Sequence, residues 1–367
     1  MKEKENIHFW DTSKLTETAG IRERCAATYL EAQLKSRFPE ESFHVASVCV
    51  NESGTYKSKA NLLLRLLSSF SPIKGLPPYC EVQIDHQTGK NTEYITIWTP
   101  LAWNDRFAGT AGGGASTGGI QYTTAPNNTQ RGWMLPFALI NGFTAATVDA
   151  SNAPGTHNWA FDTNTGELND ELIENWRARS THNMTLFGKA VAEILHQRPV
   201  LYAYLNGGSG GGRQCMVEAQ EFPQDYDGIW ASCPAINWSK FVLAGFWPVA
   251  VMNSYGQILS PDKIKYFTSA VHASVGGKDA YFKLEHRVDF DPETLVGRST
   301  KDGAITNIDA TIMKEIWGGP RRKNGQRLWY GFRPGVKFWN VGVPVASFYY
   351  SLIGKKPKPF FICNHYA

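Results

Sequence analysis

The sequence predicts an α/β fold in which the strands of a sheet are joined by helical crossovers. Three runs rich in β-branched and aromatic residues, 143–149, 199–205 and 226–232, have the composition and length of buried strands. Between them, residues 181–196 and 212–221 place apolar or helix-compatible residues at helical spacing. This alternation of strands and helices is typical of a parallel sheet.

Upstream of this stretch the sequence predicts a β-hairpin. Residues 80–86 and 93–98 have strand composition, and a turn around Gly89 separates them. Residues 60–70 (ANLLLRLLSSF) predict a short helix, and the rest of 1–78 is mixed and polar.

Downstream of Pro234 the pattern changes to helices and irregular segments rich in Trp, Gly and Lys. This change indicates a second region, a lid that follows the strands of the sheet. We therefore expect an N-terminal segment (1–79), an α/β core (80–235), a lid (236–350) and a tail (351–367).

Composition excludes several classes of protein. Of the 367 residues, 42% are hydrophobic and 19% are charged, which does not suit a disordered chain. The formal charge of +4 is too small for its length to suggest a nucleic-acid partner. The longest uncharged apolar stretch, Phe241 to Met252, is shorter than the roughly 20 residues that span a membrane. We expect no nucleic-acid or membrane partner.

The N-terminus and the cysteines bear on location and metals. Residues 1–6 (MKEKEN) are charged, and no apolar segment follows before Asp11. We therefore expect no secretory signal in this chain and, by default, a cytoplasmic location. The six cysteines show no C-x-x-C spacing, so we expect no zinc site of that kind.

The motif most informative about chemistry is G-x-S-x-G at Gly207–Gly211, centred on Ser209. A nucleophile elbow turns sharply from strand to helix and exposes its serine oxygen, so glycines are needed on both sides. A strand is predicted before this motif and a helix after it. The alternative is a phosphate-binding loop or a simple turn, but neither G-x-x-x-x-G-K-[ST] nor G-x-G-x-x-G fits this run.

A second glycine cluster, Gly112-Gly113-Gly114, follows the second predicted strand of the hairpin. Esterases of this kind take an oxyanion-stabilising N–H from a glycine-rich loop after an earlier strand. Glycine allows that N–H to approach a substrate carbonyl because it has no Cβ.

With these motifs in place, the chain resembles the tannase and feruloyl esterase family of α/β-hydrolases over roughly residues 20–350. The blocks that carry the resemblance are Pro77–Val82, Trp103–Phe107, Gly112–Gly114, Arg179–His182, Gly207–Gln214, Glu218–Pro223, Asp225–Gly228 and Pro234–Trp238.

The resemblance implies a serine esterase that acts on galloyl or hydroxycinnamoyl esters, with the α/β-hydrolase fold and an inserted lid. Ser209 would be the nucleophile, and the N–H of Gly210 with that of Gly113 or Gly114 would form the oxyanion hole. Cys25 and Cys80 match a family pair that can form a disulfide, although in a cytosolic protein they would be reduced thiols.

Two departures from the family concern its cross-links and its metal. Gly208 stands where the family commonly has a cysteine bonded to a cysteine beside the catalytic histidine. Of the family's calcium loop in the lid, residues 275–281 keep only Asp279. Because calcium takes about six to eight oxygen ligands, we expect no metal and no cofactor.

A third departure concerns the triad acid and histidine, which in this fold follow the nucleophile. Downstream of Ser209 the histidines are His272 and His286, expected to be exposed in the lid, and His365, close to a weakly held end. The acid and the histidine are therefore unknown. We expect that the chain lacks the C-terminal part that carries them, which would leave one edge of the sheet uncovered.

Two further histidines, His157 and His182, lie upstream of Ser209, and we expect His182 to have a packing role. We expect Arg213 and Asp227 to be structural braces.

Two functions remain open. The chain is either an ester hydrolase or an inactive, truncated homologue that binds phenolic esters without turning them over. A lipase-like or polyester-degrading hydrolase on the same scaffold is a third interpretation.

Overall fold

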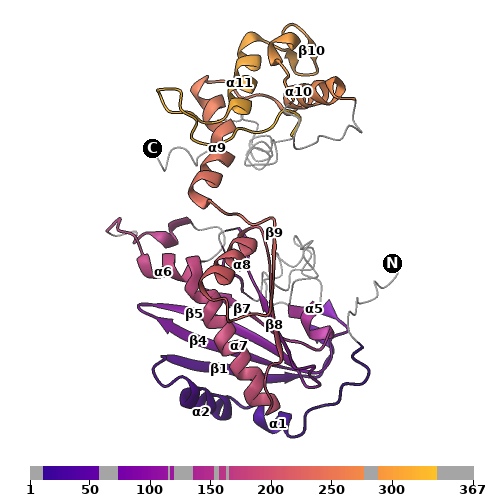
Figure 1. Cartoon of the computed structure of the whole chain (residues 1–367), viewed down its shortest axis with the longest axis vertical. Coiled ribbons are helices and arrows are strands. Elements are labelled where there is room, and N and C mark those ends of the chain that lie inside the picture. Colours follow the sequence, from indigo (N-terminus) through magenta and orange to yellow (C-terminus); the bar gives the residue numbers. More distant parts are fainter. Residues whose placement is uncertain are drawn as a thin grey trace. The chain divides into compact units, whose positions relative to one another are not determined.

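The computed structural model describes residues 11–57, 73–114, 116–119, 135–152, 157–162, 165–276 and 288–336. The chain divides into two compact units, residues 1–235 and 236–367 (Figure 1). The boundary between these units lies where the sequence places the start of the lid. The predicted tail, 351–367, lies outside the described residues.

A seven-stranded sheet forms the centre of the first unit, in the order β1-β4-β5-β7-β6-β8-β9. The strands are β1 (Phe43–Asn51), β4 (Tyr79–Thr88), β5 (Asn91–Pro100), β6 (Arg106–Thr110), β7 (Thr144–Asp149), β8 (Tyr202–Gly208) and β9 (Gly228–Ser232). A separate short pair joins β2 (Thr55–Tyr56) to β3 (Ile73–Lys74).

The sheet is mixed rather than parallel. Strands β7, β6, β8 and β9 run parallel to one another. The sequence predicts β7, β8 and β9 as strands of a parallel sheet, but it does not predict β6. Strands β1, β4 and β5 are antiparallel to their neighbours, because the β4–β5 hairpin reverses the chain before the crossovers begin. At the other edge, within the described residues, β9 pairs with β8 alone, and its Trp230 is 61% exposed.

Helices cover the sheet, with α7 on β5, β6 and β7 and α8 on β8 and β9 (Figure 1). The helical elements of this unit are α1 (Ile21–Arg24), α2 (Ala27–Arg37), α5 (Leu135–Ile140), η2 (His157–Ala160), α6 (Asp170–Glu174), η3 (Asn175–Arg179, a π-helical turn), α7 (Ser180–His196) and α8 (Gly210–Glu221).

The N-terminal part of the chain differs most from the sequence prediction. Strand β1 lies within the predicted N-terminal segment, yet it pairs with β4 and extends the main sheet. Helix α2 buries only Leu30 and Leu34, so it lacks a wide apolar stripe from which it could be recognised. The predicted helix at 60–70 lies outside the described residues.

Helix α7 packs closely on the sheet because its inward face combines large apolar residues with one glycine. Met184, Phe187 and Val191 are buried in the main core. Between them, Gly188 sits against the ring of Phe107, and a Cβ at this glycine would lie 2.5 Å from the Phe107 Cε2 atom. The missing side chain therefore sets how near the helix approaches the sheet.

The C-terminal end of α7 is fixed by a buried histidine. His196 is 2% exposed, its Nδ1 lies 2.8 Å from Thr18 Oγ1, and its Nε2 lies 2.9 Å from Thr99 Oγ1. Its ring stacks on Trp103 with the centroids 4.6 Å apart. Burial, followed by the charges of Arg198 and Arg24, lowers the pKa of His196 to about 3. A neutral imidazole therefore joins the N-terminal segment to β5.

The second unit is helical around its own apolar core. Its elements are α9 (Trp238–Ser254), α10 (Pro261–Ser274), η4 (Pro292–Leu295), β10 (Ser299–Thr300), β11 (Gly303–Ala304) and α11 (Asn307–Gly318). A capping box between Thr306 and Asp309 starts α11, and Lys263 Nζ lies 2.6 Å from the buried Asp309 carboxylate. Among the described helices, none is long and apolar enough to span a bilayer.

We predict that Gly188→Ala destabilises the protein even though alanine favours helices. The added Cβ would meet Phe107 and Ala146, and overpacking of about 1–3 kcal/mol should exceed the roughly 1 kcal/mol gain in helix propensity. Gly245→Ala in α9 is the matched control, because a Cβ there has open space and should be neutral or stabilising. Urea denaturation measures both variants, and equal stabilisation by both would contradict the close packing of α7.

We predict that His196 makes stability fall on acidification. Unfolded histidine takes up its proton near pH 6.5, whereas the folded pKa is about 3, so stability present above pH 6.5 is lost as the pH falls. Between pH 7 and pH 4.5, wild type should lose about 2–3 kcal/mol more than His196→Gln, which does not titrate. Denaturation curves at both pH values test this, and parallel losses would rule it out.

Candidate functional site

Ser209 occupies the sharp turn between β8 and α8. Its backbone has φ 58° and ψ −117°, a conformation that is strained for any residue other than glycine. Hydrogen bonds hold it there. Its N–H donates to the Ser232 carbonyl at 3.0 Å, and its carbonyl accepts from the N–H groups of Arg213 and Ala235, both at 3.0 Å. The geometry is that of the nucleophile elbow expected from the sequence.

The glycines around Ser209 are required by contacts between backbones. A Cβ on Gly207 would lie 2.3 Å from the Gly211 carbonyl oxygen, and one on Gly211 would lie 2.3 Å from that of Gly112. A Cβ on Gly210 would lie 2.3 Å from the Gly114 oxygen. No real Cβ tolerates such distances, so the two glycine clusters of the sequence are in direct contact.

The two candidate oxyanion donors of this loop differ in their hydrogen bonds. The Gly113 N–H donates to the Ser116 carbonyl at 3.1 Å. The N–H groups of Gly114 and Gly210 have no acceptor among the described residues, and the Gly114 nitrogen lies 2.8 Å from the position of a Cβ on Gly210. Gly114 and Gly210 therefore form the better pair of donors, with Gly210 at the N-terminus of α8.

Gln214, one turn into α8, links this glycine loop to its surroundings. Its Oε1 accepts the Gly112 N–H at 3.0 Å, and its Nε2 donates to the Thr117 carbonyl at 3.1 Å and to Thr181 Oγ1 at 2.9 Å. The side chain is 2% exposed. The sequence does not predict a role for Gln214, because neither its spacing nor its residue type suggests one.

Arg213 contacts the π-helical turn η3. Its Nη1 and Nη2 donate to the carbonyls of Arg177 and Trp176 at 3.0 and 2.8 Å, and its guanidinium lies 3.9 Å from the Trp176 ring centroid. Burial lowers its pKa to about 10. These contacts are those of the expected brace. Asp227 also has such contacts, since its Oδ2 accepts the Ala203 N–H at 2.7 Å.

Among the described histidines of the first unit, each contacts a partner other than Ser209. His44 pairs with Glu31, His86 with Glu93 and Glu41, His182 with Asp225, and His196 with Thr18 and Thr99. In the second unit, His272 is half-buried and its Nε2 lies 3.0 Å from the Gly335 carbonyl, so it is not the exposed residue expected. The side chains of His157, His286 and His365 lie outside the described residues.

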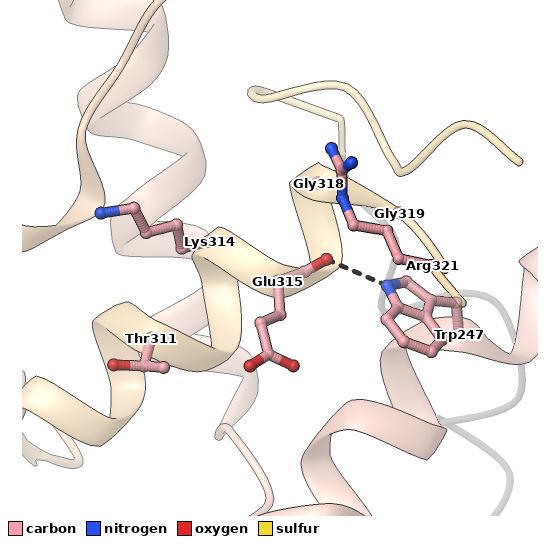
Figure 2. A pocket seen from close by; sticks show the side chains of 7 residues that line it. All are labelled: Trp247, Thr311, Lys314, Glu315, Gly318, Gly319 and Arg321. Atoms are coloured by element: carbon pink, nitrogen blue, oxygen red, sulfur yellow. Dashed lines mark hydrogen bonds between the residues drawn. The ribbon is translucent and has the colours of Figure 1, made fainter. Parts of the chain in front are cut away.

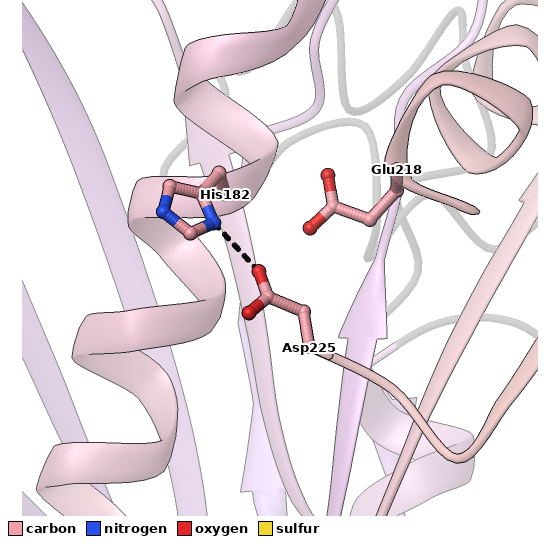
Figure 3. A group of neighbouring side chains, drawn as sticks. All are labelled: His182, Glu218 and Asp225. Atoms are coloured by element: carbon pink, nitrogen blue, oxygen red, sulfur yellow. Dashed lines mark hydrogen bonds and ion pairs between the residues drawn. The ribbon is translucent and has the colours of Figure 1, made fainter. Parts of the chain in front are cut away.

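His182 and Asp225 form a His–Asp pair like that of a catalytic triad, but the pair does not lie beside Ser209. The His182 ring stacks on Phe222 with the centroids 4.0 Å apart, beyond the end of α8, in line with the expected packing role. Glu218, the third member of the group in Figure 3, follows Ser209 by nine residues. At 1.5 Å per residue this is about 13 Å along the helix, too far for proton transfer to Ser209.

The cysteines expected to pair are neighbours. Cys25 and Cys80 are free thiols joined by a side-chain hydrogen bond, which with burial raises the pKa of Cys80 well above its ordinary value. The disulfide itself stays a prediction.

Within the second unit, a cavity of about 440 Å³ is lined by Trp247, Thr311, Lys314, Glu315, Gly318, Gly319 and Arg321 (Figure 2). Trp247 Nε1 donates to the Glu315 carbonyl at 3.0 Å, which fixes the indole against α11. Asp279, the residue that the resemblance matches to the family's calcium loop, lies outside the described residues.

Comparisons with known proteins agree on one family. The family model described as "Tannase and feruloyl esterase" matches residues 80–344. A protein of Arthroderma benhamiae named a probable feruloyl esterase is 34% identical over 261 residues, which are 68% of this chain and 46% of that protein. Probable feruloyl esterase B-1 of Aspergillus fumigatus is 29% identical, over 79% of this chain and 52% of that protein. The chain thus spans about half the length of these relatives.

Solved structures show the same fold. A tannin acyl hydrolase from Aspergillus niger matches with a TM-score of 0.65 and 18% identity, over 96% of this chain and 68% of that one. Feruloyl esterase B from Aspergillus oryzae matches with a TM-score of 0.63 and 19% identity, over 84% and 60%. The α/β-hydrolase fold is therefore confirmed.

We predict that Gln214→Met destabilises the protein by about 2–4 kcal/mol. The substitution preserves most of the volume but leaves the Gly112 N–H and the Thr117 carbonyl without their partners. Gln220→Met, at an exposed position of the same helix, should change stability by less than about 0.5 kcal/mol. Denaturation curves compare the two, and equal effects would show that Gln214 is not a brace.

Proposed function

Because the chain belongs to the tannase and feruloyl esterase family, we propose that it is a carboxylic ester hydrolase that works through an acyl-enzyme on Ser209. One observation supports this most strongly. Ser209 has a strained backbone at a strand-to-helix turn, next to two backbone N–H groups without acceptors among the described residues.

The proposed chemistry begins when Ser209 Oγ attacks the carbonyl carbon of the ester. The carbonyl oxygen becomes an oxyanion and accepts hydrogen bonds from the N–H groups of Gly210 and Gly114. When the C=O bond re-forms, the bond to the alcohol breaks and the alcohol leaves with the proton taken from Ser209. The positive end of the α8 dipole lies at the same point and favours the negative charge. Water then attacks the acyl-enzyme, releases the acid and restores the Ser209 hydroxyl.

A base must take the Ser209 proton in this scheme. The described histidines of the first unit contact other partners, so the proposal requires a base from outside the described residues of that unit. A hydroxyl without such a base would retain only the rate that the oxyanion donors and binding supply.

For substrates we propose small-molecule phenolic esters with galloyl or hydroxycinnamoyl acyl groups. The names of the relatives, feruloyl esterase and tannin acyl hydrolase, support this choice. Ester hydrolysis by a serine nucleophile needs no cofactor, and we propose none for the reaction.

Because the described histidines of the first unit contact other partners, a second candidate function is favoured. In this function the chain is a homologue that binds phenolic esters but does not turn them over. Its Ser209 would have the elbow geometry without an activating base. The two candidates differ in whether Ser209 reacts, not in whether the ligand binds.

We predict that wild type hydrolyses methyl ferulate or methyl gallate and that Ser209→Ala abolishes the reaction. A fluorophosphonate probe should label wild type but not Ser209→Ala. Ser232→Ala is the matched control, because within the described residues its hydroxyl makes its one hydrogen bond to the Cys233 thiol, and its loss should not affect labelling.

Equal rates for wild type and Ser209→Ala would overturn the proposal. Ligand binding without labelling of wild type would support the inactive homologue. A preference for long aliphatic acyl chains would indicate a lipase-like hydrolase instead.

A further inference from the structure

Three side chains from three different segments meet on the flank of the first unit, away from Ser209. His182 comes from α7, Glu218 from α8, and Asp225 from the segment between α8 and β9. Figure 3 shows the three side chains directed toward one another. One potential ligand atom of each lies within 4.8 Å of the others, and His182 Nδ1 is 2.6 Å from Asp225 Oδ2. We call this group the His182 cluster.

Glu218 is the member of the cluster that needs explaining. It is fully buried, and in the described part of the chain the only group that can share a hydrogen bond with its carboxylate oxygens is the Asp225 carboxyl. Asp225, which it faces, is only 8% exposed. An ionised carboxylate without donors is costly to bury, and a second carboxylate beside it adds repulsion. Something positive, a proton or a cation, must lie between these two acids.

The composition of the cluster suits a cation that prefers mixed ligands. Zinc and similar ions accept both imidazole nitrogen and carboxylate oxygen as ligands, and two carboxylates neutralise a divalent charge. Calcium would need about six to eight oxygens, which the cluster lacks. The His182 side chain is 26% exposed, which leaves a path to solvent and room for a water ligand.

We propose that His182, Glu218 and Asp225 bind one divalent transition-metal ion, for which zinc is the reference. Ligands at about 2.0–2.2 Å in tetrahedral geometry lie roughly 3.3 Å apart, so the short contact between His182 and Asp225 must open by several tenths of an ångström. The ion would join α7, α8 and the segment that leads into β9. Its role would be structural, because the cluster lies about 13 Å along α8 from Ser209.

A proton is the competitor for the same place. Burial and the neighbouring Asp225 raise the pKa of Glu218 to about 9, so at neutral pH the metal must displace a proton.

Other ionisable groups also face the cluster. They are Lys189 on α7, which donates to the Asp225 backbone carbonyl, Glu221 and Cys215 on α8, and the buried Tyr226. Burial raises the pKa of Cys215 to about 12 and that of Tyr226 well above its ordinary value, so both stay protonated at neutral pH. Lys189 repels a cation, and Glu221 offsets that repulsion.

To test this, the chelator-treated full chain is titrated with zinc chloride, and binding is measured by calorimetry and by thermal unfolding. We expect one saturable site and a rise in Tm. Glu218→Gln keeps the shape and lets an amide donate to Asp225, so it should fold, and it should bind zinc at least tenfold more weakly. His44→Gln removes an exposed histidine beside Glu31 and should leave zinc binding unchanged.

His182→Asn is a second variant of the same site, so the test does not depend on the folding of Glu218→Gln alone. The Tm of each variant without metal reports whether that variant folds. Binding that is absent in wild type, or equal in wild type and Glu218→Gln, would overturn the proposal and leave a proton alone between the acids. Ser209→Ala should bind zinc as wild type does, so the result does not depend on the proposed esterase activity.

Discussion

The architecture of the site depends on two stretches of backbone that touch without side chains between them. Strands β6 and β8 are parallel neighbours, with Thr110 opposite Asn206, and so they deliver the two glycine clusters to the same end of the sheet. The Ala111 N–H extends this ladder to the Asn206 carbonyl at 3.0 Å. Beyond that point a methyl group on Gly210 would collide with the backbone of Gly114, and one on Gly211 with that of Gly112. The conformation of Ser209 and the direction of the neighbouring N–H groups both follow from this contact.

Helix α8 extends this constraint into the rest of the unit. Its first residue, Gly210, lies against Gly114; Arg213 donates to the carbonyls of η3, and Gln214 hydrogen-bonds Gly112 and Thr117. Farther along, Glu218 faces the segment that returns to β9. Successive turns of one helix therefore fix successive parts of the fold. This explains why a block of the sequence that extends well past the nucleophile carries the family resemblance.

The sequence predicts those parts of the structure that depend on local pattern. The helix ending at His196, the hairpin and the elbow at Ser209 need only periodicity, strand composition and glycine. Strand β1 is missed because its partner β4 comes nearly thirty residues later, and pairing at that distance leaves no local signal.

Side-chain contacts within the site are missed for a related reason. The choice of Gly114 over Gly113 depends on a hydrogen bond to Ser116, which the sequence does not reveal. The role of Gln214 depends on three partners from two other segments. The ligands of the His182 cluster come from three segments whose spacing matches no metal motif, so an expectation based on motifs overlooks them.

A histidine beside an aspartate is not in itself evidence of catalysis, and here its position along α8 decides its meaning. The N-terminal end of a helix is positive and stabilises anions, and that is where Ser209 would generate an oxyanion. The C-terminal end is negative and stabilises cations. Glu218 lies in the last turn of α8, beside His182 and Asp225. The same helix thus favours an anion at the elbow and a cation at the cluster, which separates the chemistry proposed for its two ends.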